Sequence, residues 1–198
     1  MMRAVERSVC RSAGWGWLAS RVILPRALAG VRPAGDVLEM GCGGGAMAAE
    51  MLAADPAITL TALDIDPSMV DATMRRLGPY GHRARAIEAD CADLPFEAGS
   101  FDTVVSFLML HHVGRWEDAL GEVVRVLRPG GLLAGCDALD TRVARWFHQA
   151  QGARFRSAGH AELRRRLESL PLERIAIRTH LGGVIATFSA RRAPGTGR

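Results

Sequence analysis

Strand-length apolar runs alternate with helix-length amphipathic stretches through the middle of this chain. The runs typical of buried strands are 36–40, 59–64, 84–89, 103–110 and 132–136, and helix-like stretches lie between them at 46–54, 67–77 and 115–127. A strand followed by a helix, repeated several times, is typical of a parallel sheet whose two faces are covered by helices.

The alternation loosens in the last third of the chain. Residues 141–170 have a helical pattern with a break at 157–159, and two more strand-length runs follow at 172–178 and 183–190. Because only residues 179–182 join these two runs, we expect an antiparallel hairpin. The predicted fold class is therefore α/β, with a Rossmann-like, mostly parallel sheet of seven strands, helices on both faces and a C-terminal antiparallel hairpin.

Capping and turn residues mark several of these boundaries. Asp66-Pro67-Ser68 supplies a capping acid and a proline for a first helical turn, and Arg128-Pro129-Gly130-Gly131 ends a helix. A chain of 198 residues suits one such domain, which we expect at 35–190. Residues 1–34 are then a helical lid or appendage, and 191–198 a disordered tail.

Composition narrows the class of protein only slightly. The formal net charge is +4 and all 25 basic residues are arginine, a balance that fits an ordinary solvated surface, although an anionic partner would also suit it. The four cysteines are widely spaced and form no C-x-x-C pair, so neither a zinc site nor a disulfide framework is predicted. The apolar stretch 15–24 is too short for a membrane span and makes a poor signal peptide, and we expect a cytoplasmic protein.

A glycine-rich turn, Gly41-Cys42-Gly43-Gly44-Gly45, follows the first predicted strand. Glycine suits this place because its φ is unrestricted and because a missing Cβ lets a ligand approach the backbone. The helix that follows presents free N–H groups to such a ligand. Glu39, at the end of the strand, adds a negative charge where a ligand ammonium group could bind. The same turn could also form without any ligand.

The spacing of this turn fits more than one cofactor. Gly41-x-Gly43-x-x-Ala46 satisfies the dinucleotide pattern G-x-G-x-x-G/A, and an acid follows about 20 residues later. That acid, Asp64, ends the second strand, where its carboxylate can accept hydrogen bonds from two ribose hydroxyls. Asp66 is better placed to cap the next helix. The turn alone therefore does not separate a nicotinamide cofactor from S-adenosylmethionine.

Later segments resemble the class I S-adenosylmethionine-dependent methyltransferases, in particular the methyltransferase type 11 group that includes quinone-pathway enzymes. The resemblance rests on 89–102 with its Leu94-Pro95-Phe96, on Leu110-His111-His112-Val113 and on 126–131. Together with the glycine turn, these motifs follow the order and spacing of the family over residues 37–136. The resemblance implies an enzyme that takes a methyl group from S-adenosylmethionine and releases S-adenosylhomocysteine.

The resemblance also implies which residues hold the cofactor. The methionine portion of the cofactor would face Glu39, Gly41, Cys42 and Gly43, and the ribose would face Asp64. The adenine ring would contact Ile65, Met69, Asp90 and the backbone of Cys91. Phe107 and Leu108 would lie near the sulfonium. Met69, Cys91 and Phe107 would equally suit the protein core.

Two histidines, His111 and His112, follow the fourth predicted strand on the side where an acceptor should bind. Either side chain can titrate near neutrality, and a base helps when the acceptor is a hydroxyl or a carbon acid. They are therefore candidate catalytic residues, with a structural role at the strand end as the alternative. The other histidines lack the spacing of metal ligands, and we expect no metal.

The acceptor is expected to be a small molecule, and a lipophilic one would suit a helix at 11–26 that closes over it. Residues 1–34 are the candidate lid of its site and 141–170 the candidate wall. The chain lacks the Asn-Pro-Pro-Tyr motif of methyltransferases that act on nucleic-acid bases, so a nucleic-acid substrate is not expected. Residues 11–26 interleave apolar side chains with arginines, which suits a helix packed on the domain or a peripheral membrane contact. The alternatives are an NAD(P)-binding oxidoreductase and a protein that binds S-adenosylmethionine without catalysis.

Overall fold

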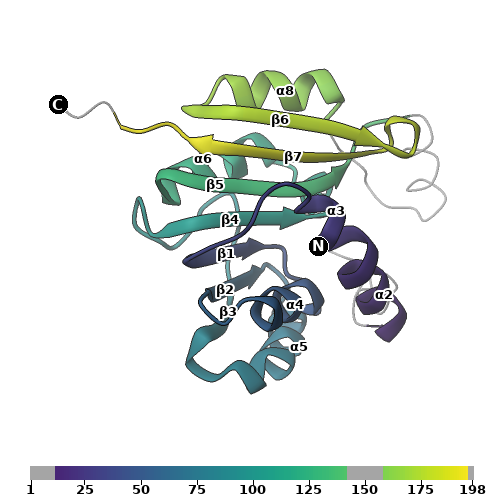
Figure 1. Cartoon of the computed structure of the whole chain (residues 1–198), viewed down its shortest axis with the longest axis vertical. Helices are drawn as coiled ribbons and strands as arrows, with labels where there is room; N and C mark the ends of the chain where they lie inside the picture. The colour runs from purple at the N-terminus through teal and green to yellow at the C-terminus, as the bar shows by residue number, and fades with distance from the viewer. Residues whose placement is uncertain (1–11, 142–157, 196–198) are drawn as a thin grey trace.

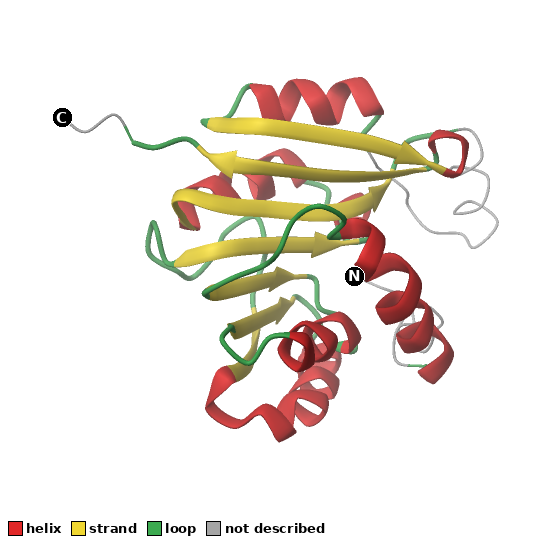
Figure 2. Cartoon of the chain, in the orientation of Figure 1, coloured by secondary structure: helices red, strands yellow, loops and turns green. Residues whose placement is uncertain are grey.

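One seven-stranded sheet organises the part of the chain that the computed structural model describes, residues 12–141 and 158–195 (Figures 1 and 2). Its strand order is β3-β2-β1-β4-β5-β7-β6. The strands are β1 (Asp36–Met40), β2 (Thr59–Asp64), β3 (Ala84–Glu88), β4 (Phe101–Phe107), β5 (Leu127–Ala138), β6 (Leu172–His180) and β7 (Ile185–Arg192). The first five pair in parallel, whereas β7 pairs antiparallel to both β5 and β6. The predicted fold class is confirmed.

Helices lie on both faces of this sheet (Figure 2). The α-helices are α2 (Ala13–Leu18), α3 (Leu24–Ala27), α4 (Ala46–Ala54), α5 (Pro67–Leu77), α6 (Trp116–Val126) and α8 (His160–Glu168). A π-helix, η1 (Ala19–Ile23), joins α2 to α3, and 3-10 turns form η2 (Gly78–Arg83), η3 (Leu110–His112) and η4 (Leu181–Gly183). Within the described ranges, no helix is long and apolar enough to cross a membrane.

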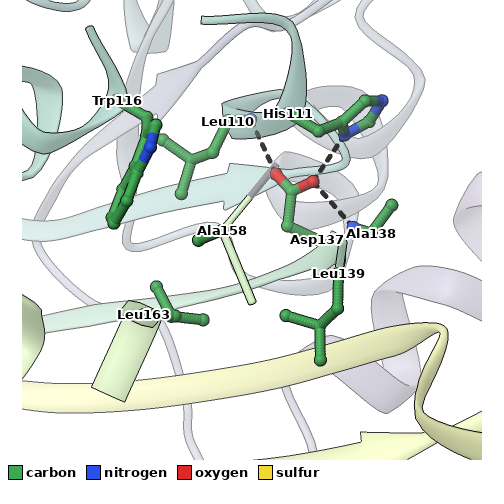
Figure 3. A pocket seen from close by; sticks show the side chains of 8 residues that line it. All are labelled: Leu110, His111, Trp116, Asp137, Ala138, Leu139, Ala158 and Leu163. Carbon is green, nitrogen blue, oxygen red and sulfur yellow. Dashed lines mark hydrogen bonds and ion pairs between the residues drawn. The ribbon is translucent and has the colours of Figure 1, made fainter. Parts of the chain in front are cut away.

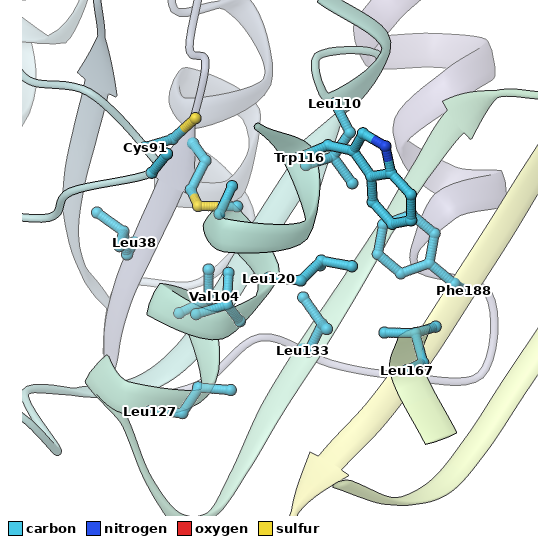
Figure 4. Close-up of a cluster of buried hydrophobic side chains, with 14 of the residues drawn as sticks. Leu38, Cys91, Val104, Leu110, Trp116, Leu120, Leu127, Leu133, Leu167 and Phe188 are labelled. Carbon is cyan, nitrogen blue, oxygen red and sulfur yellow. The ribbon is translucent and has the colours of Figure 1, made fainter. Parts of the chain in front are cut away.

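Two apolar clusters form the core, one on each face of the sheet. On one face, α6 and α8 pack against the sheet, and Trp116 of α6 and Phe188 of β7 belong to the same cluster (Figure 4). On the other face, α3, η1 and α4 pack against β1, β2 and β4. The strands are therefore buried on both faces where the helices cover them, which explains their nearly continuous apolar runs.

The fourth strand is shorter than its apolar run predicts. The run 103–110 is continuous, but β4 ends at Phe107 because Leu108 takes a left-handed backbone conformation with φ of 51°. The chain then enters η3, so the predicted strand and the two histidines are separated by a turn. This turn is part of the candidate site below.

The segment Arg128-Pro129-Gly130-Gly131 ends α6 as predicted and then forms an irregular start to β5. Strand β4 pairs Phe101 with Leu127 and next Thr103 with Leu132, so the four residues between are left out of the ladder. The guanidinium of Arg128 contacts Asp36 at 3.0 Å and Asp102 at 2.5 Å. One arginine thus ties together the amino ends of β1, β4 and β5.

The last strand is longer than predicted. Residues 191–198 were expected to form a tail, but Arg191 and Arg192 belong to β7 because they pair with Leu132 and Leu172 of the neighbouring strands. The guanidinium of Arg192 also donates to the carbonyl of Leu127. Residues 196–198 lie outside the described residues, as do 142–157 of the predicted wall and 1–11 of the predicted appendage.

We expect Gly135→Ala to destabilise the fold strongly. A Cβ at this position in β5 would lie 2.1 Å from the carbonyl oxygen of Ser106 and 3.0 Å from the ring of Phe188. Overpacking of this kind costs about 1–3 kcal/mol of unfolding free energy. Urea unfolding should show that loss. Gly114→Ala is the matched control, since its Cβ would meet nothing within 4 Å, and equal stability of the two variants would contradict the prediction.

Candidate functional site

The glycine turn connects β1 to α4, and three of its residues have left-handed backbone conformations. The φ angles of Gly41, Gly43 and Gly45 are 67°, 52° and 72°, values that residues other than glycine rarely adopt. Cys42 donates its N–H to the carbonyl of Leu63 at 2.9 Å, which holds the turn against the end of β2. The turn therefore has a fixed shape, set by its own glycines and by β2.

A buried threonine of α5 clamps the same turn from the other side. The hydroxyl of Thr73 donates to the carbonyl of Gly43 at 2.9 Å and lies 3.4 Å from the sulfur of Cys42. A Cβ at Gly45 would lie 2.9 Å from the Thr73 side chain, so this close approach also requires glycine. Burial raises the pKa of the Cys42 thiol, and this thiol stays protonated.

Glu39 lies at the base of the turn, and its carboxyl group is buried with little to pair with it. Its side chain is 2% exposed, and Oε2 has no hydrogen-bond partner among the described residues. Burial, together with the nearby charge of Asp64, raises the pKa of Glu39 to about 8. A ligand ammonium group placed above this carboxyl would supply both the missing donor and the opposite charge.

Asp64 ends β2 beside the turn. Its carboxylate accepts N–H groups from Gly43 and Asp66, each at 3.0 Å, which leaves lone pairs for further donors. Burial raises the pKa of Asp64, and these backbone hydrogen bonds oppose the rise. Asp66 accepts the N–H of Ser68 at 2.9 Å and caps α5 as predicted, whereas the ligand-facing role of Asp64 stays a prediction.

The two apolar residues expected at the adenine ring differ in exposure. Ile65 follows β2 and is 58% exposed, so its side chain is available to a ligand at the carboxyl edge of the sheet. Met69 lies on α5 and is 0% exposed, so it belongs to the interior in this structure. Of the pair, Ile65 has the surface with which a planar ligand could make contact.

Asp90 and Cys91 follow β3 on the same edge of the sheet. Asp90 accepts the N–H of Ala92 at 2.9 Å and forms an ion pair with Arg115 at 2.8 Å. Cys91 is buried, and this burial together with the charge of Asp90 raises the pKa of its thiol to about 12. Arg115 was not predicted as a site residue. It precedes α6, and its partner lies 25 positions earlier.

Phe107 and Leu108 lie where β4 ends. The Phe107 side chain is 6% exposed and packs in the apolar cluster that also contains Cys42. Leu108 donates its N–H to the carbonyl of Cys136 at 2.8 Å. The next residue, Met109, lies against the glycine turn, because a Cβ at Gly41 would be 2.0 Å from the Met109 side chain. The turn after β4 and the glycine turn are therefore in direct contact.

The two candidate catalytic histidines differ in their surroundings. His111 is 7% exposed, and its Nδ1 lies 2.5 Å from Oδ1 of Asp137 at the end of β5 (Figure 3). His112 is exposed, and its ring centroid lies 4.0 Å from that of His111. A hollow beside Asp137 is lined mainly by apolar side chains, among them Trp116, Leu139 and Leu163. Sequence reasoning missed Asp137, although an acid at the end of a strand is the signal that identified Glu39 and Asp64.

Within residues 12–141 and 158–195, the remaining histidines do not gather into a metal site. In the part of the chain that the structure describes, no group of three His, Cys, Asp or Glu side chains could hold a metal ion. His148 lies outside the described residues. His180 contacts Thr187 at 3.0 Å, in the C-terminal hairpin. The site is therefore a row of carboxyl groups, backbone turns and His111 along the carboxyl edge of the sheet.

The chain is similar to known methyltransferases in sequence. Residues 38–135 match the family model described as a methyltransferase domain. The chain is 34% identical over 97 residues to a demethylmenaquinone methyltransferase of Thermus thermophilus, covering 49% of this chain and 44% of that protein. It is 31% identical over 131 residues to a phthiotriol/phenolphthiotriol dimycocerosates methyltransferase of Mycobacterium leprae, covering 64% and 47%. The chain thus spans about half the length of these curated relatives.

Its fold is similar to that of a geranyl diphosphate methyltransferase solved in complex with S-adenosylmethionine. The TM-score is 0.73 at 13% sequence identity, and the match covers 92% of each chain. At this identity the likeness concerns the fold.

We expect the stability of the protein to depend on pH through Glu39. The unfolded chain has the ordinary value of 4.5 for this carboxyl and the folded protein a pKa of about 8, so the folded state holds a proton that the unfolded state releases. The free energy of unfolding should therefore fall as the pH rises from about 5 to about 8. Glu39→Gln cannot ionise, so it should lose less stability over this range and exceed the wild type near the upper end.

Urea unfolding at the two ends of this range measures the difference. The matched control is Glu97→Gln, an exposed glutamate in a surface loop, which should follow the wild type at both values. If Glu39→Gln kept the wild-type dependence on pH, the buried carboxyl would not be the source of it.

Proposed function

Since the chain belongs to the class I S-adenosylmethionine-dependent methyltransferases, we propose that it transfers a methyl group from S-adenosylmethionine to a small lipophilic acceptor and releases S-adenosylhomocysteine. The observation that carries this function is Oε2 of Glu39, a buried oxygen without a donor among the described residues. It lies at the base of a glycine turn, where the ammonium group of the cofactor would satisfy it.

The remaining site residues fit the rest of the cofactor. The turn at Gly41, Cys42 and Gly43 would hold the methionine portion, and Asp64 has lone pairs left for the ribose hydroxyls. Ile65 offers exposed apolar surface to the adenine ring. Asp90 would accept a hydrogen bond from the adenine amino group. Its carboxylate would then bind both that amino group and Arg115.

When bound, the cofactor supplies a methyl group on a positively charged sulfur. The protein has to align the acceptor with that methyl group and exclude water, since the displacement needs no covalent enzyme nucleophile. Phe107 and Leu108 at the end of β4 would provide the apolar wall near the sulfur. This role agrees with the burial of Phe107 and with the contact between Met109 and the glycine turn.

A lipophilic acceptor is supported by the names of the sequence relatives, which refer to demethylmenaquinone and to phthiotriol and phenolphthiotriol dimycocerosates. The three buried cysteines of the described chain are free thiols, which supports a place in the cytoplasm.

We expect S-adenosylhomocysteine to bind and NADH not to bind, because Glu39 suits an ammonium group and not a pyrophosphate. Asp64→Asn should weaken binding of S-adenosylhomocysteine by about tenfold to a hundredfold, since hydrogen bonds to a charged group contribute about 1.5–3 kcal/mol. Isothermal titration calorimetry measures both affinities.

The matched control for this experiment is Asp71→Asn, an exposed carboxylate on α5, which should bind like the wild type. Binding of NADH in preference to S-adenosylhomocysteine would favour an oxidoreductase and contradict the proposal. Transfer of labelled methyl groups to a mycobacterial total lipid extract then tests catalysis, and tight binding without transfer to any acceptor would favour a protein that has lost it.

The N-terminal segment supports a second proposal, a peripheral membrane contact that brings the lipophilic acceptor to the site. One side of α2, η1 and α3 packs on the domain through Ala19, Leu24 and Ala27, which are 1%, 7% and 4% exposed. The other side leaves Trp17 65% and Leu18 38% exposed, next to the exposed Arg21. Aromatic and aliphatic groups beside arginine suit the surface of an anionic membrane.

This segment also lies next to the cofactor turn, which suits a lid. Gly16 of α2 approaches the first residue of α4, because a Cβ on Gly16 would lie 3.6 Å from the Cβ of Ala46. A segment that contacts a membrane on one side and the start of α4, which follows the glycine turn, on the other would place the site close to the lipid surface. Arg11, part of the same predicted pattern, lies outside the described residues.

We expect the double variant Trp17→Ala and Leu18→Ala to bind anionic vesicles about tenfold more weakly or worse, because burial of one large apolar side chain contributes about 1.5–3 kcal/mol. Sedimentation with vesicles of equal parts phosphatidylglycerol and phosphatidylcholine measures this. The control is Leu181→Ala, a 79% exposed leucine in the turn between β6 and β7. Wild-type protein that stays in the supernatant would remove the membrane contact while leaving methyl transfer unaffected.

A further inference from the structure

The carboxylate of Asp137 receives four polar contacts although it is only 4% exposed. Its Oδ2 accepts N–H groups from Met109 at 3.0 Å and Leu110 at 2.6 Å. Its Oδ1 accepts the N–H of Ala138 at 2.7 Å and lies 2.5 Å from Nδ1 of His111 (Figure 3). A buried carboxylate is costly without such donors, and here they all come from β5 itself and from the turn after β4.

The contacts at Oδ2 fix the shape of that turn. Leu108 has a left-handed backbone, and its N–H is already used by the carbonyl of Cys136. The two following N–H groups both point to Asp137, so the chain reverses and carries Met109 onto Gly41. Asp137 thereby holds His111 at a fixed distance from the proposed cofactor turn.

The contact at Oδ1 fixes the protonation of the His111 ring. An ionised carboxylate can only accept hydrogen bonds, so Nδ1 carries a proton in this contact. In the neutral imidazole the lone pair is then on Nε2. His111 is therefore held as a ring whose basic nitrogen is the one turned away from Asp137.

We propose that Asp137 is a positioning residue that presents His111 as a proton acceptor, and that the methyl acceptor accordingly reacts through a hydroxyl group or an acidic carbon. This inference rests on the proposed methyl transfer and names its substrate class. A carboxylate acceptor, already ionised, would have no use for a base, and neither would a neutral amine at the moment of attack.

In the reaction, the O–H or C–H bond of the acceptor breaks and its proton goes to Nε2 of His111. The electron pair left on the acceptor atom forms the new bond to the methyl carbon. The bond between that carbon and sulfur breaks, and its electron pair stays on sulfur, which becomes neutral. The imidazolium formed on His111 is stabilised by the negative charge of Asp137.

Among the described residues, His112 of η3 is a titratable side chain in contact with this ring, with the two ring centroids 4.0 Å apart. From α6 and α8 the neighbouring side chains at the hollow are Trp116 and Leu163, which are apolar. His112 is therefore the neighbouring group whose part in catalysis has to be separated from that of His111 by mutation.

We expect His111→Asn to lower kcat about 100-fold or more, because general base catalysis contributes about 10²–10⁴. The amide NH₂ of asparagine can replace Nδ1 as donor to Asp137, so the turn keeps its anchor while the base is lost. Affinity for S-adenosylhomocysteine should stay within about twofold. Labelled methyl transfer to the mycobacterial lipid extract and calorimetry measure the two effects, with His160→Asn, an exposed residue that begins α8, as control.

Asp137→Asn tests the positioning role itself. Its amide can turn NH₂ toward Nδ1 and so move the ring proton to Nε2, which lowers kcat at least about tenfold. Nitrogen NMR of the histidines, which needs no acceptor, should show His111 protonated at Nδ1 in the wild type.

The outcomes separate this inference from the function on which it rests. Wild-type kcat in His111→Asn, a loss confined to His112→Asn, or a His111 ring protonated at Nε2 in the wild type would each overturn it. If Asp137→Asn fails to fold, His111→Asn and the NMR tautomer still decide. Wild-type protein that binds no S-adenosylhomocysteine would count against the proposed function instead. The NMR tautomer of His111 would then be the remaining test of its positioning by Asp137.

Discussion

Carboxylates buried at the carboxyl ends of neighbouring strands determine how the loops of this edge are shaped. Removing such a group from water costs several kcal/mol unless hydrogen-bond donors replace the water. Asp64 of β2 receives two backbone N–H groups, and Asp137 of β5 receives three and a histidine ring. These donors belong to the loops that follow β1, β2 and β4 and to Ala138, the last residue of β5. Glu39 of β1 differs because one of its oxygens has no donor among the described residues.

Structural elements that are determined by their own residues were predictable from the sequence. The glycine turn requires left-handed backbone at Gly41, Gly43 and Gly45, and the residue type states that requirement directly. The end of β4 was not predictable in this way, since the apolar run continues past it. Leu108 turns because pairing of β4 with β5 brings Cys136 and Asp137 alongside, and that register exists only in the folded sheet.

The site residues also fall into those that a local sequence pattern predicted and those that depend on contacts in the folded sheet. Glu39 and Asp64 were found because each ends a predicted strand beside the turn. Asp137 gives the same signal one residue beyond its predicted strand, but its partner His111 lies 26 positions earlier and no local pattern connects them. The sequence also did not predict which apolar side chains would be exposed. An apolar residue after a strand can be exposed, as Ile65 is, or buried in the interior, as Met69 is.

The turn after β4 couples the two halves of the proposed reaction site. On one side it is anchored by Asp137, and on the other Met109 lies against Gly41, which has no room for a Cβ. A change at Asp137 therefore reaches the cofactor turn through the backbone of Met109 as well as the acceptor side through His111. A change of the His111 ring does not affect the backbone of this turn directly, because the ring contacts Oδ1 of Asp137 whereas the backbone N–H groups of the turn bind Oδ2. Proton acceptance and cofactor binding are thus separable at the histidine and not at the aspartate.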